Sequence, residues 1–239
     1  MTSKKNLLPF IKNKDLYDHV EKVLAVAKKS LADSEKKFHK NSVDPFSALF
    51  DAILQNIPMT IWVDQEKSRQ NQKTLQNALG DFHQNILGSV HGFENMGTGK
   101  GKVFDIKNNT KKILAEVKNK HNTTKGNHKV AIYDDLKAQL KKPAYKSYTA
   151  YYVEVIPKSK KVYDKPFTPS DNRTGKRRPV NERIRQIDGK SFYALATGDS
   201  EALRKLYEVL PKVIGTYLDK SIDKAIKDPS FKELFDRIY

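Results

Sequence analysis

The run ILAEVKNK at 113–120 most constrains the fold of this chain, because it combines the apolar pattern of a buried strand with charged side chains. Alternate residues of an extended strand share a face, so Glu116 and Lys118 lie on one side and Ala115 and Val117 on the other. The pair has a simple explanation as an ion pair on a half-exposed strand. If a second carboxylate lies nearby, the same pair also fits a catalytic site.

Asp105 supplies that second carboxylate, eleven residues before Glu116 in the strand-like run VFDIK. The turn-like segment KNNTKK joins the two runs, so a hairpin would bring the carboxylates together. Two converging carboxylates form a hard-oxygen site for Mg²⁺, with water and a phosphate oxygen filling the remaining positions. A neighbouring lysine can hold or deprotonate the attacking water and offset charge on phosphorus. Asp105, Glu116 and Lys118 therefore fit the chemistry of a phosphodiester-hydrolysing Asp, Glu-x-Lys site, and a structural ion pair of Glu116 with Lys118 stays open as the alternative.

The order of the elements along the chain indicates an α/β or α+β fold with a mixed central sheet. Apolar periodicity and turn residues predict helices from Asp15 to Leu31 and at 42–54, 69–90, 128–142 and 199–228, and strands within 91–97, 103–107, 112–121, 147–157 and 190–198. One domain is expected at this length. Its expected parts are a helical N-terminal part at 1–72, a catalytic core at 73–157, a basic insertion at 158–190, and a strand with C-terminal helices at 191–239.

The chain is strongly basic, with 45 Lys and Arg against 28 Asp and Glu, a formal net charge of +17. Such an excess favours a polyanionic partner, because each neutralised phosphate releases counterions; a lysine-rich composition with no such partner is the alternative. Thiol chemistry, disulfides and Cys-type zinc sites are excluded, because the chain contains no cysteine. The sequence offers neither a signal peptide nor a membrane-spanning run, so a cytoplasmic protein with no membrane partner is expected.

Arginine and lysine concentrate in NRTGKRRPVNERIRQ at 172–186, so the basic insertion at 158–190 is the predicted DNA-reading insertion. The guanidinium fork matches both phosphate and the guanine edge, so bases and phosphates remain open as the contacts of any one arginine. Non-specific steering or a disordered tail are the alternatives. The TGKGK turn at 98–102 is a further candidate for phosphate contact. The predicted DNA-binding residues are Lys120, Asn122, Arg173, Lys176, Arg177, Arg178, Arg183 and Arg185, although Lys120 and Asn122 also fit a solvated turn.

Several spaced blocks together resemble a known family. They are DPFSALFDA, QKTLQNALGDFHQNILGSVHGFEN, FDIKNN, LAEVKNKHNTTKG, YDDL and FYALATG, between about residues 40 and 200. The chain resembles the type II restriction endonucleases that cut GGNCC-type sites, the AsuI-isoschizomer group with a PD-(D/E)xK nuclease core. These blocks are more specific than the three catalytic residues alone.

The resemblance assigns Asp105 as the metal-binding acid of the first catalytic strand, Glu116 as the second ligand and Lys118 as the catalytic lysine. Phe104 stands where the motif has proline, a departure that is frequent in this superfamily. A helix carboxylate often completes such sites, and Asp81 and Glu94 are the candidates. His83 is interpreted as a structural residue, because a lone helix histidine is more often structural than catalytic.

The leading hypothesis is a bacterial, Mg²⁺-dependent endonuclease that cuts double-stranded DNA at a short palindrome by attack of a metal-activated water. The resemblance implies a GGNCC site, a homodimer matched to its two-fold symmetry, and a cognate DNA methyltransferase that forms no stable complex with it. A repair or junction-resolving nuclease on the same fold is the second hypothesis. The third is a non-catalytic basic DNA-binding protein whose acidic pair is structural.

Overall fold

The computed structural model describes residues 5–97, 103–218 and 222–239. Its backbone forms two compact units. One unit combines Met1–Val20 with Gly80–Tyr239, and the other is Glu21–Leu79. The helices α1 (Asn13–Ala32) and α4 (Met59–Gly88) contribute residues to both.

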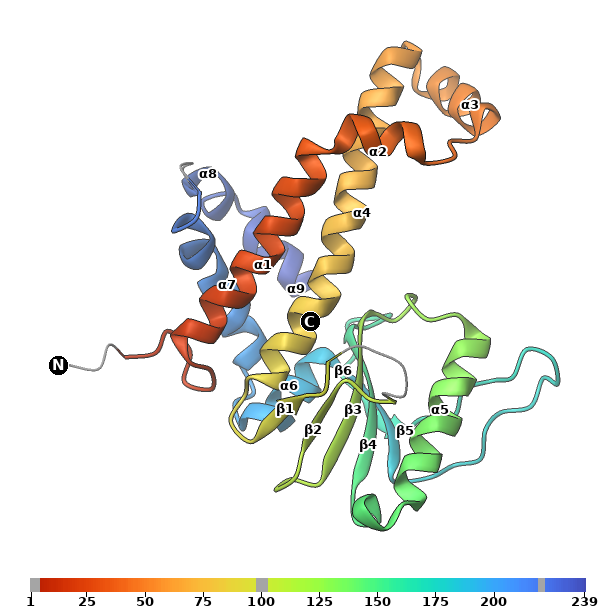
Figure 1. Cartoon of the computed structure of the whole chain (residues 1–239), viewed down its shortest axis with the longest axis vertical. Helices are drawn as coiled ribbons and strands as arrows, with labels where there is room; N and C mark the ends of the chain where they lie inside the picture. Colours follow the sequence, from red (N-terminus) through yellow and green to blue (C-terminus); the bar gives the residue numbers. More distant parts are fainter. Residues whose placement is uncertain (1–4, 98–102, 219–221) are drawn as a thin grey trace. The chain divides into compact units, whose positions relative to one another are not determined.

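The larger unit is built on a six-stranded mixed sheet with the order β1-β2-β3-β4-β6-β5 (Figure 1). The neighbours β1–β2, β2–β3 and β5–β6 are antiparallel, whereas β3–β4 and β4–β6 are parallel. The strands are β1 (Phe93–Asn95), β2 (Ile106–Asn108), β3 (Ile113–Lys120), β4 (Thr149–Ile156), β5 (Asp164–Pro166) and β6 (Ile184–Asp188). The predicted mixed sheet flanked by helices is confirmed.

Helix α5 (Gly126–Lys141) connects the parallel strands β3 and β4 and covers one face of the sheet (Figure 1). Strand β4 is apolar on both faces, as expected of a strand buried between helices. Its Tyr152 ring stacks on Phe167 with 4.6 Å between centroids. The α5-side core consists of Phe104, Leu114, Ile132, Tyr133, Leu136, Leu140, Tyr148, Ala150, Tyr152, Phe167 and Ile184.

The helices that follow β6 add further packing to the same unit. Helix α6 (Gly189–Thr197) contacts β4, where the rings of Tyr151 and Phe192 lie 5.7 Å apart. The remaining elements are the short 3-10 helix η1 (Pro143–Tyr145), α7 (Ala202–Gly215), α8 (Asp223–Ile226) and α9 (Ser230–Ile238).

The predicted strand at 190–198 is wrong, because this segment forms helix α6. Asp188 caps the helix by accepting a hydrogen bond from the Ser191 N–H at 3.0 Å, and Gly198 ends it in the left-handed conformation. The apolar run of this segment did not distinguish a short buried helix from a strand. The two capping residues, which flank the run, carried that information.

The polar segment 158–190 contains two strands that the sequence analysis did not predict. Strand β6 lies between β4 and β5, and its Ile184, Ile187 and Asp188 are buried. Two consecutive polar residues, Arg185 and Gln186, separate the buried Ile184 and Ile187, so the strand lacks the apolar alternation of period two that would have identified it in the sequence.

Gly189, the first residue of α6, lies against the backbone of β4. A Cβ at this position would approach the Val155 carbonyl oxygen to 2.2 Å and the Val155 Cα to 2.8 Å. The Gly189→Ala variant is expected to lose about 3 kcal/mol of unfolding free energy, because a central strand cannot move aside. Urea denaturation measures the loss.

Gly80→Ala is the matched control for this variant. Gly80 lies within α4, and its added Cβ would meet only the Asn119 Cβ, at 3.8 Å. Alanine is expected to stabilise a helix interior by about 0.5–1 kcal/mol relative to glycine. Equal effects of the two substitutions would contradict the close approach at Gly189.

The smaller unit has its own apolar contacts, formed by α3 (Pro45–Gln55) and the start of α4. Ala48 and Ala52 of α3 pack with Trp62 of α4. The predicted aspartate cap is confirmed, since Asp44 accepts a hydrogen bond from the Phe46 N–H at 3.0 Å and proline follows it. The unit also contains α2 (Ser34–Lys40).

Within the described ranges, no single helix is long and apolar enough to cross a membrane. Helices α3 and α4 satisfy the same test of length and composition only when taken together, and they are bent by 111° where they meet.

Candidate active site

Asp105 lies where strand β2 begins, beside β3, and hydrogen bonds from two different parts of the residue fix it there. Its N–H donates to the Ala115 carbonyl at 2.9 Å, although the register partner of Ala115 is Ile106. Two consecutive residues therefore face Ala115, an irregularity of the kind that re-aims side chains in β-bulges. The Asp105 carboxylate accepts a hydrogen bond from the Val117 N–H at 2.7 Å. This carboxylate is thus held at the backbone between Glu116 and Lys118.

Glu116 and Lys118 extend from β3 and form an ion pair, with 2.6 Å between the Lys118 Nζ and the Glu116 Oε1. Their side chains are only 15% and 26% exposed. The pair is therefore less exposed than an ordinary surface ion pair. Glu116 also interacts directly with the Asp105 carboxyl group. The predicted hairpin brings the three side chains together.

Burial raises the pKa values of both carboxyl groups. Burial raises the pKa of Asp105, although the Val117 N–H and the Lys118 charge partly oppose this effect. Burial, followed by the negative charge of Asp105, raises the pKa of Glu116 to about 7. The single positive charge of Lys118 does not balance two partly desolvated carboxylates, so binding of a cation between them would be favoured.

The two candidates for an additional acid differ in their surroundings. Asp81 of α4 is close enough for its charge to raise the pKa of Asp105. Glu94 of β1 instead forms an ion pair with Lys107 at 3.1 Å. The electrostatics therefore favour Asp81 over Glu94 as a neighbour of the candidate site.

A buried carboxylate on the next strand was not anticipated from the sequence. Glu154 of β4 is the register partner of Lys118 and is 2% exposed. It accepts hydrogen bonds from the Lys129 ammonium at 2.7 Å, the Tyr163 hydroxyl at 2.6 Å and the Gln186 amide at 2.8 Å. The signal was available in TAYYVEVI, where a single glutamate interrupts a strand that is otherwise apolar.

His83 has the structural environment that the sequence analysis expected. Its Nδ1 lies 2.9 Å from the Tyr193 hydroxyl, and burial lowers its pKa to about 4. The imidazole is therefore neutral at physiological pH, hydrogen-bonded within the larger unit.

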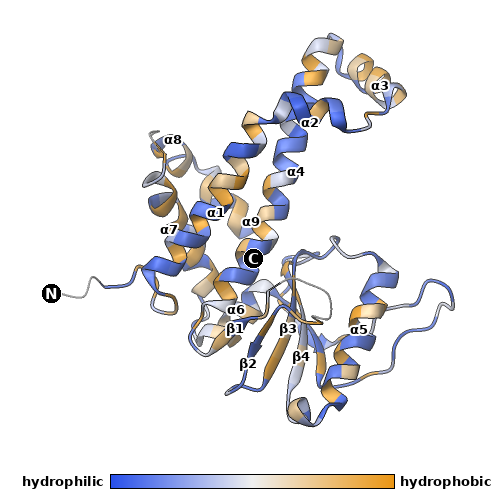
Figure 2. Ribbon diagram, viewed as in Figure 1, coloured by the Kyte–Doolittle hydropathy of each residue, from blue (hydrophilic) through white to orange (hydrophobic). Residues whose placement is uncertain are grey.

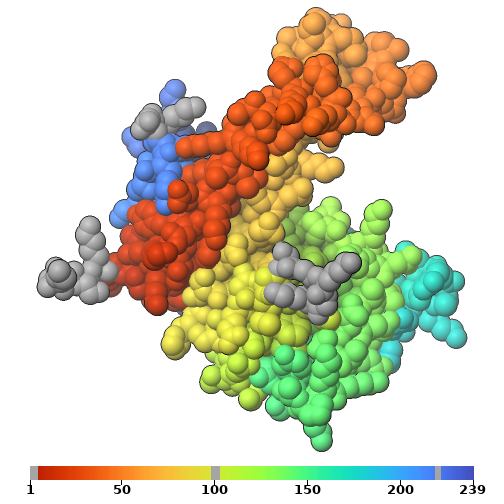
Figure 3. Space-filling view, in the orientation of Figure 1, coloured from red at the N-terminus to blue at the C-terminus, as the bar shows by residue number. Residues whose placement is uncertain are grey.

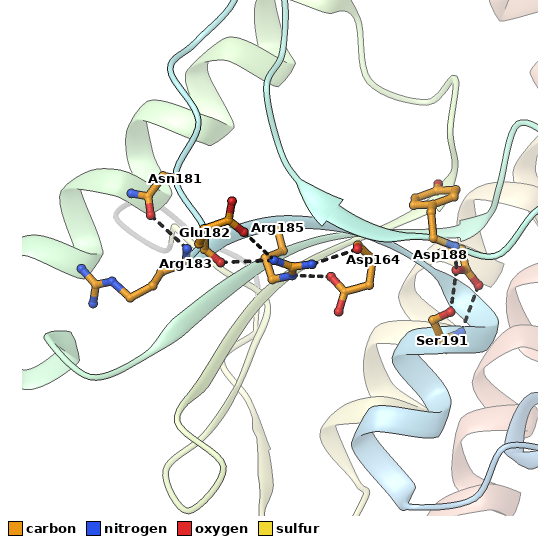
Figure 4. Close-up of polar contacts among 8 residues, drawn as sticks. Asp164, Asn181, Glu182, Arg183, Arg185, Asp188 and Ser191 are labelled. Atoms are coloured by element: carbon orange, nitrogen blue, oxygen red, sulfur yellow. Dashed lines mark hydrogen bonds and ion pairs between the residues drawn. The ribbon is translucent and has the colours of Figure 1, made fainter.

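Three of the predicted DNA-binding arginines make structural contacts, and Figure 4 shows those of Arg185. Arg185 forms an ion pair with Asp164 at 2.5 Å and a second with Glu182 at 3.2 Å, and Arg183 donates to the Lys146 carbonyl. Outside the view, Arg178 binds Asp134 through both ends of its guanidinium fork, at 2.9 and 2.7 Å. These contacts anchor the basic segment to β5, to α5 and to the turn before β4.

The other predicted DNA-binding residues are more available. Lys176 and Arg177 are exposed and form no ion pair within the described part of the chain, and Arg173 approaches Asp171 at only 3.8 Å. Lys120 is half-buried at the end of β3, and Asn122 is exposed in the following turn. The TGKGK turn at 98–102 lies outside the described residues.

The donor set suits a hard cation bound partly by solvent and substrate. The described residues contain no group of three or more His, Cys, Asp or Glu side chains arranged to hold a metal alone. Mg²⁺ commonly takes one or two carboxylates, with waters and phosphate oxygens completing its octahedron. The carboxylates of Asp105 and Glu116 fit that requirement.

Comparison with known proteins identifies the family. Residues 8–219 match the family model described as Eco47II restriction endonuclease. The chain is 42% identical over 219 residues to the type II restriction enzyme Eco47II of Escherichia coli, covering 91% of this chain and 90% of that protein. It is 29% identical over 243 residues to the type II restriction enzyme Sau96I of Staphylococcus aureus, covering 100% and 90%. These matches confirm the predicted resemblance, and the chain belongs to the Eco47II restriction endonuclease family.

Proposed function

We propose that this protein is a Mg²⁺-dependent type II restriction endonuclease that hydrolyses double-stranded DNA at a short palindrome of the GGNCC type. The observation that carries the proposal is the half-buried, hydrogen-bonded arrangement of Asp105, Glu116 and Lys118 at the β2–β3 hairpin. The family match and the names of its relatives support the reaction class. The site sequence rests on the resemblance of the sequence blocks.

Each residue of the proposed active site has a separate role. Asp105 and Glu116 would bind Mg²⁺, which supplies Lewis acidity toward a phosphate oxygen and a water when bound. Lys118, whose Nζ lies 2.6 Å from Glu116, would hold the scissile phosphate or the attacking water and offset negative charge in the transition state. Asp81 is the proposed additional acid, because its charge acts on Asp105.

DNA recognition is assigned to the exposed cations of the basic segment. Arg173, Lys176 and Arg177 are available for bases or phosphates, and Lys120 and Asn122 extend this surface past β3. A homodimer would match the two-fold symmetry of a palindrome. We place the enzyme in the bacterial cytoplasm, alongside a methyltransferase that protects the host's own sites without forming a stable complex.

Plasmid cleavage with mapped ends tests this function. Incubation with Mg²⁺ is expected to give discrete fragments whose ends all fall within GGNCC sites, and omission of the metal is expected to leave the plasmid intact. Discrete ends at another sequence would contradict the assigned site. Structure-dependent nicking would favour a repair or junction-resolving nuclease, and sequence-independent binding without cleavage would favour a non-catalytic protein.

The contacts of the arginines predict that some cations of the basic segment bind DNA and that others stabilise the fold. The Lys176→Ala/Arg177→Ala variant is expected to weaken DNA binding and to reduce the slope of log K against log salt by about 1–2, because up to two phosphate contacts are lost. Fluorescence anisotropy with a short duplex, with Ca²⁺ replacing Mg²⁺, measures the change.

Arg185→Ala is the contrasting variant. Its guanidinium already binds Asp164 and Glu182. Its removal is therefore expected to lower the free energy of unfolding and to leave the salt slope of DNA binding nearly unchanged. A larger salt-slope change for Arg185→Ala than for the double variant would reverse these assignments.

A further inference from the structure

The smaller unit exposes an unusual amount of apolar surface on helix α3. Twelve large apolar side chains are exposed among the described residues, and seven of them lie between residues 46 and 61. Five form what we call the α3 stripe: Phe46, Leu49, Phe50, Ile53 and Leu54, which are 50–83% exposed. Figure 2 shows α3 as largely hydrophobic, and Figure 3 shows its atoms uncovered on the face drawn.

The spacing of the α3 stripe is that of a packed interface. Its residues follow the pattern i, i+3, i+4, i+7, i+8, which defines the core-facing side of an amphipathic helix. The opposite side of α3 already has a partner, because Ala48 and Ala52 pack with Trp62. A helix that is apolar on both sides is normally buried on both. The α3 stripe therefore lacks an occupant within the described part of its unit.

The charge of the surrounding segment narrows the choice of occupant. Residues 41–66 contain four acidic residues and no Lys or Arg, in a chain whose net charge is +17. DNA and anionic lipid both require cations, so neither suits this surface. The acids are also satisfied locally: Asp44 caps α3, and Asp51 accepts hydrogen bonds from Trp62 and Gln55, both at 2.9 Å.

The exposed area is appropriate for a second copy of the chain. At about 200 Å² for each fully exposed large apolar side chain, the α3 stripe with Met59 and Ile61, which are 44% and 47% exposed, offers about 900 Å². A standard stable interface buries about that area on each partner. Two basic molecules also approach with least repulsion through a segment that has no basic residues. An isologous contact between two α3 stripes satisfies these conditions.

We propose that the α3 stripe is the homodimer interface of this enzyme. The inference rests on the proposed function in one respect, because that function calls for a two-fold dimer. It adds the surface that forms the dimer and the apolar, helix-to-helix chemistry of the contact.

Sedimentation velocity without DNA or metal tests the interface. The wild-type protein is expected to sediment as two 27.4-kDa chains, and Phe50→Glu/Leu54→Glu is expected to raise the dimer dissociation constant by roughly 100-fold or more. Leu31→Glu is the matched control, since Leu31 is 63% exposed in the same unit but outside the stripe. Circular dichroism verifies that each variant is folded.

A second measurement does not depend on introducing charge. The chain has no cysteine, so Leu54→Cys provides a single site for a short bismaleimide cross-linker while the surface stays largely apolar. A covalent dimer is expected at micromolar protein, and Leu31→Cys is expected to give none.

Two outcomes would overturn the proposal: a monomeric wild type, whether or not its stripe binds phosphatidylcholine vesicles, or a dimer that survives Phe50→Glu/Leu54→Glu. Because neither DNA nor metal is present, these results are independent of cleavage. A dimer without nuclease activity would contradict the proposed function alone, and a nuclease whose stripe does not self-associate would contradict this inference alone.

Discussion

Cleavage by the Glu116→Gln variant is expected to fall at least about 1,000-fold, because the change removes a metal-binding charge while keeping the shape of the side chain. Lys118→Ala is expected to lose about 100-fold or more, since the ammonium that lies 2.6 Å from Glu116 would no longer stabilise developing charge. Single-turnover cleavage of a duplex with one GGNCC site measures both rates.

Binding must be separated from catalysis in this comparison. Affinity for the same duplex in Ca²⁺ is expected to change much less than the cleavage rate. Glu201→Gln, which alters an exposed glutamate on the surface beside Arg204, is the charge-matched control and is expected to cleave like the wild type. Near-normal cleavage by Glu116→Gln would show that the active site does not lie at the β2–β3 hairpin.

Loss of the Glu154 carboxylate is expected to destabilise the larger unit by about 3 kcal/mol, because it leaves the Lys129 ammonium without its buried partner. Glu154→Leu removes three hydrogen bonds from a side chain that is 2% exposed. The unfolding free energy in urea reports the effect.

A double-mutant cycle identifies the source of this loss. Adding Lys129→Met to Glu154→Leu is expected to recover part of the stability, because no unpaired charge then remains. Tyr163→Phe removes one of the three donors and is expected to cost about 1 kcal/mol. If Glu154→Leu were no worse than Tyr163→Phe, the Lys129 pair would contribute little to folding.

The parts of the fold that the sequence predicted best are those with unambiguous local signals. The run ILAEVKNK and the Tyr- and Val-rich run at 149–156 became neighbouring strands β3 and β4. Asp44 and Pro45 marked the start of α3. The segment around β6 failed because its pairing with β4 is a long-range choice, made by burial rather than by local propensity.

The candidate site shows the same division between local and long-range information. Alternation along β3 brought Glu116 and Lys118 to one face, and a short hairpin brought Asp105 to them. Glu154 was missed because its partners Lys129, Tyr163 and Gln186 come from three other segments. Likewise, Arg178 and Arg185 appeared available in the sequence, since the acids that bind them lie up to 44 residues away.

The hydrogen bond from the Val117 N–H to the Asp105 side chain makes the length of the hairpin a chemical parameter. The Asp105 carboxylate accepts the hydrogen bond that the Val117 N–H would otherwise donate to a carbonyl of the neighbouring strand. The position of the acid is therefore tied to the pairing of β2 with β3. Adding or deleting one residue in the turn at 109–112 would turn Asp105 toward the opposite face of the sheet. The turn thus acts as a spacer between the two acids, so its number of residues is constrained independently of the contacts that its side chains make.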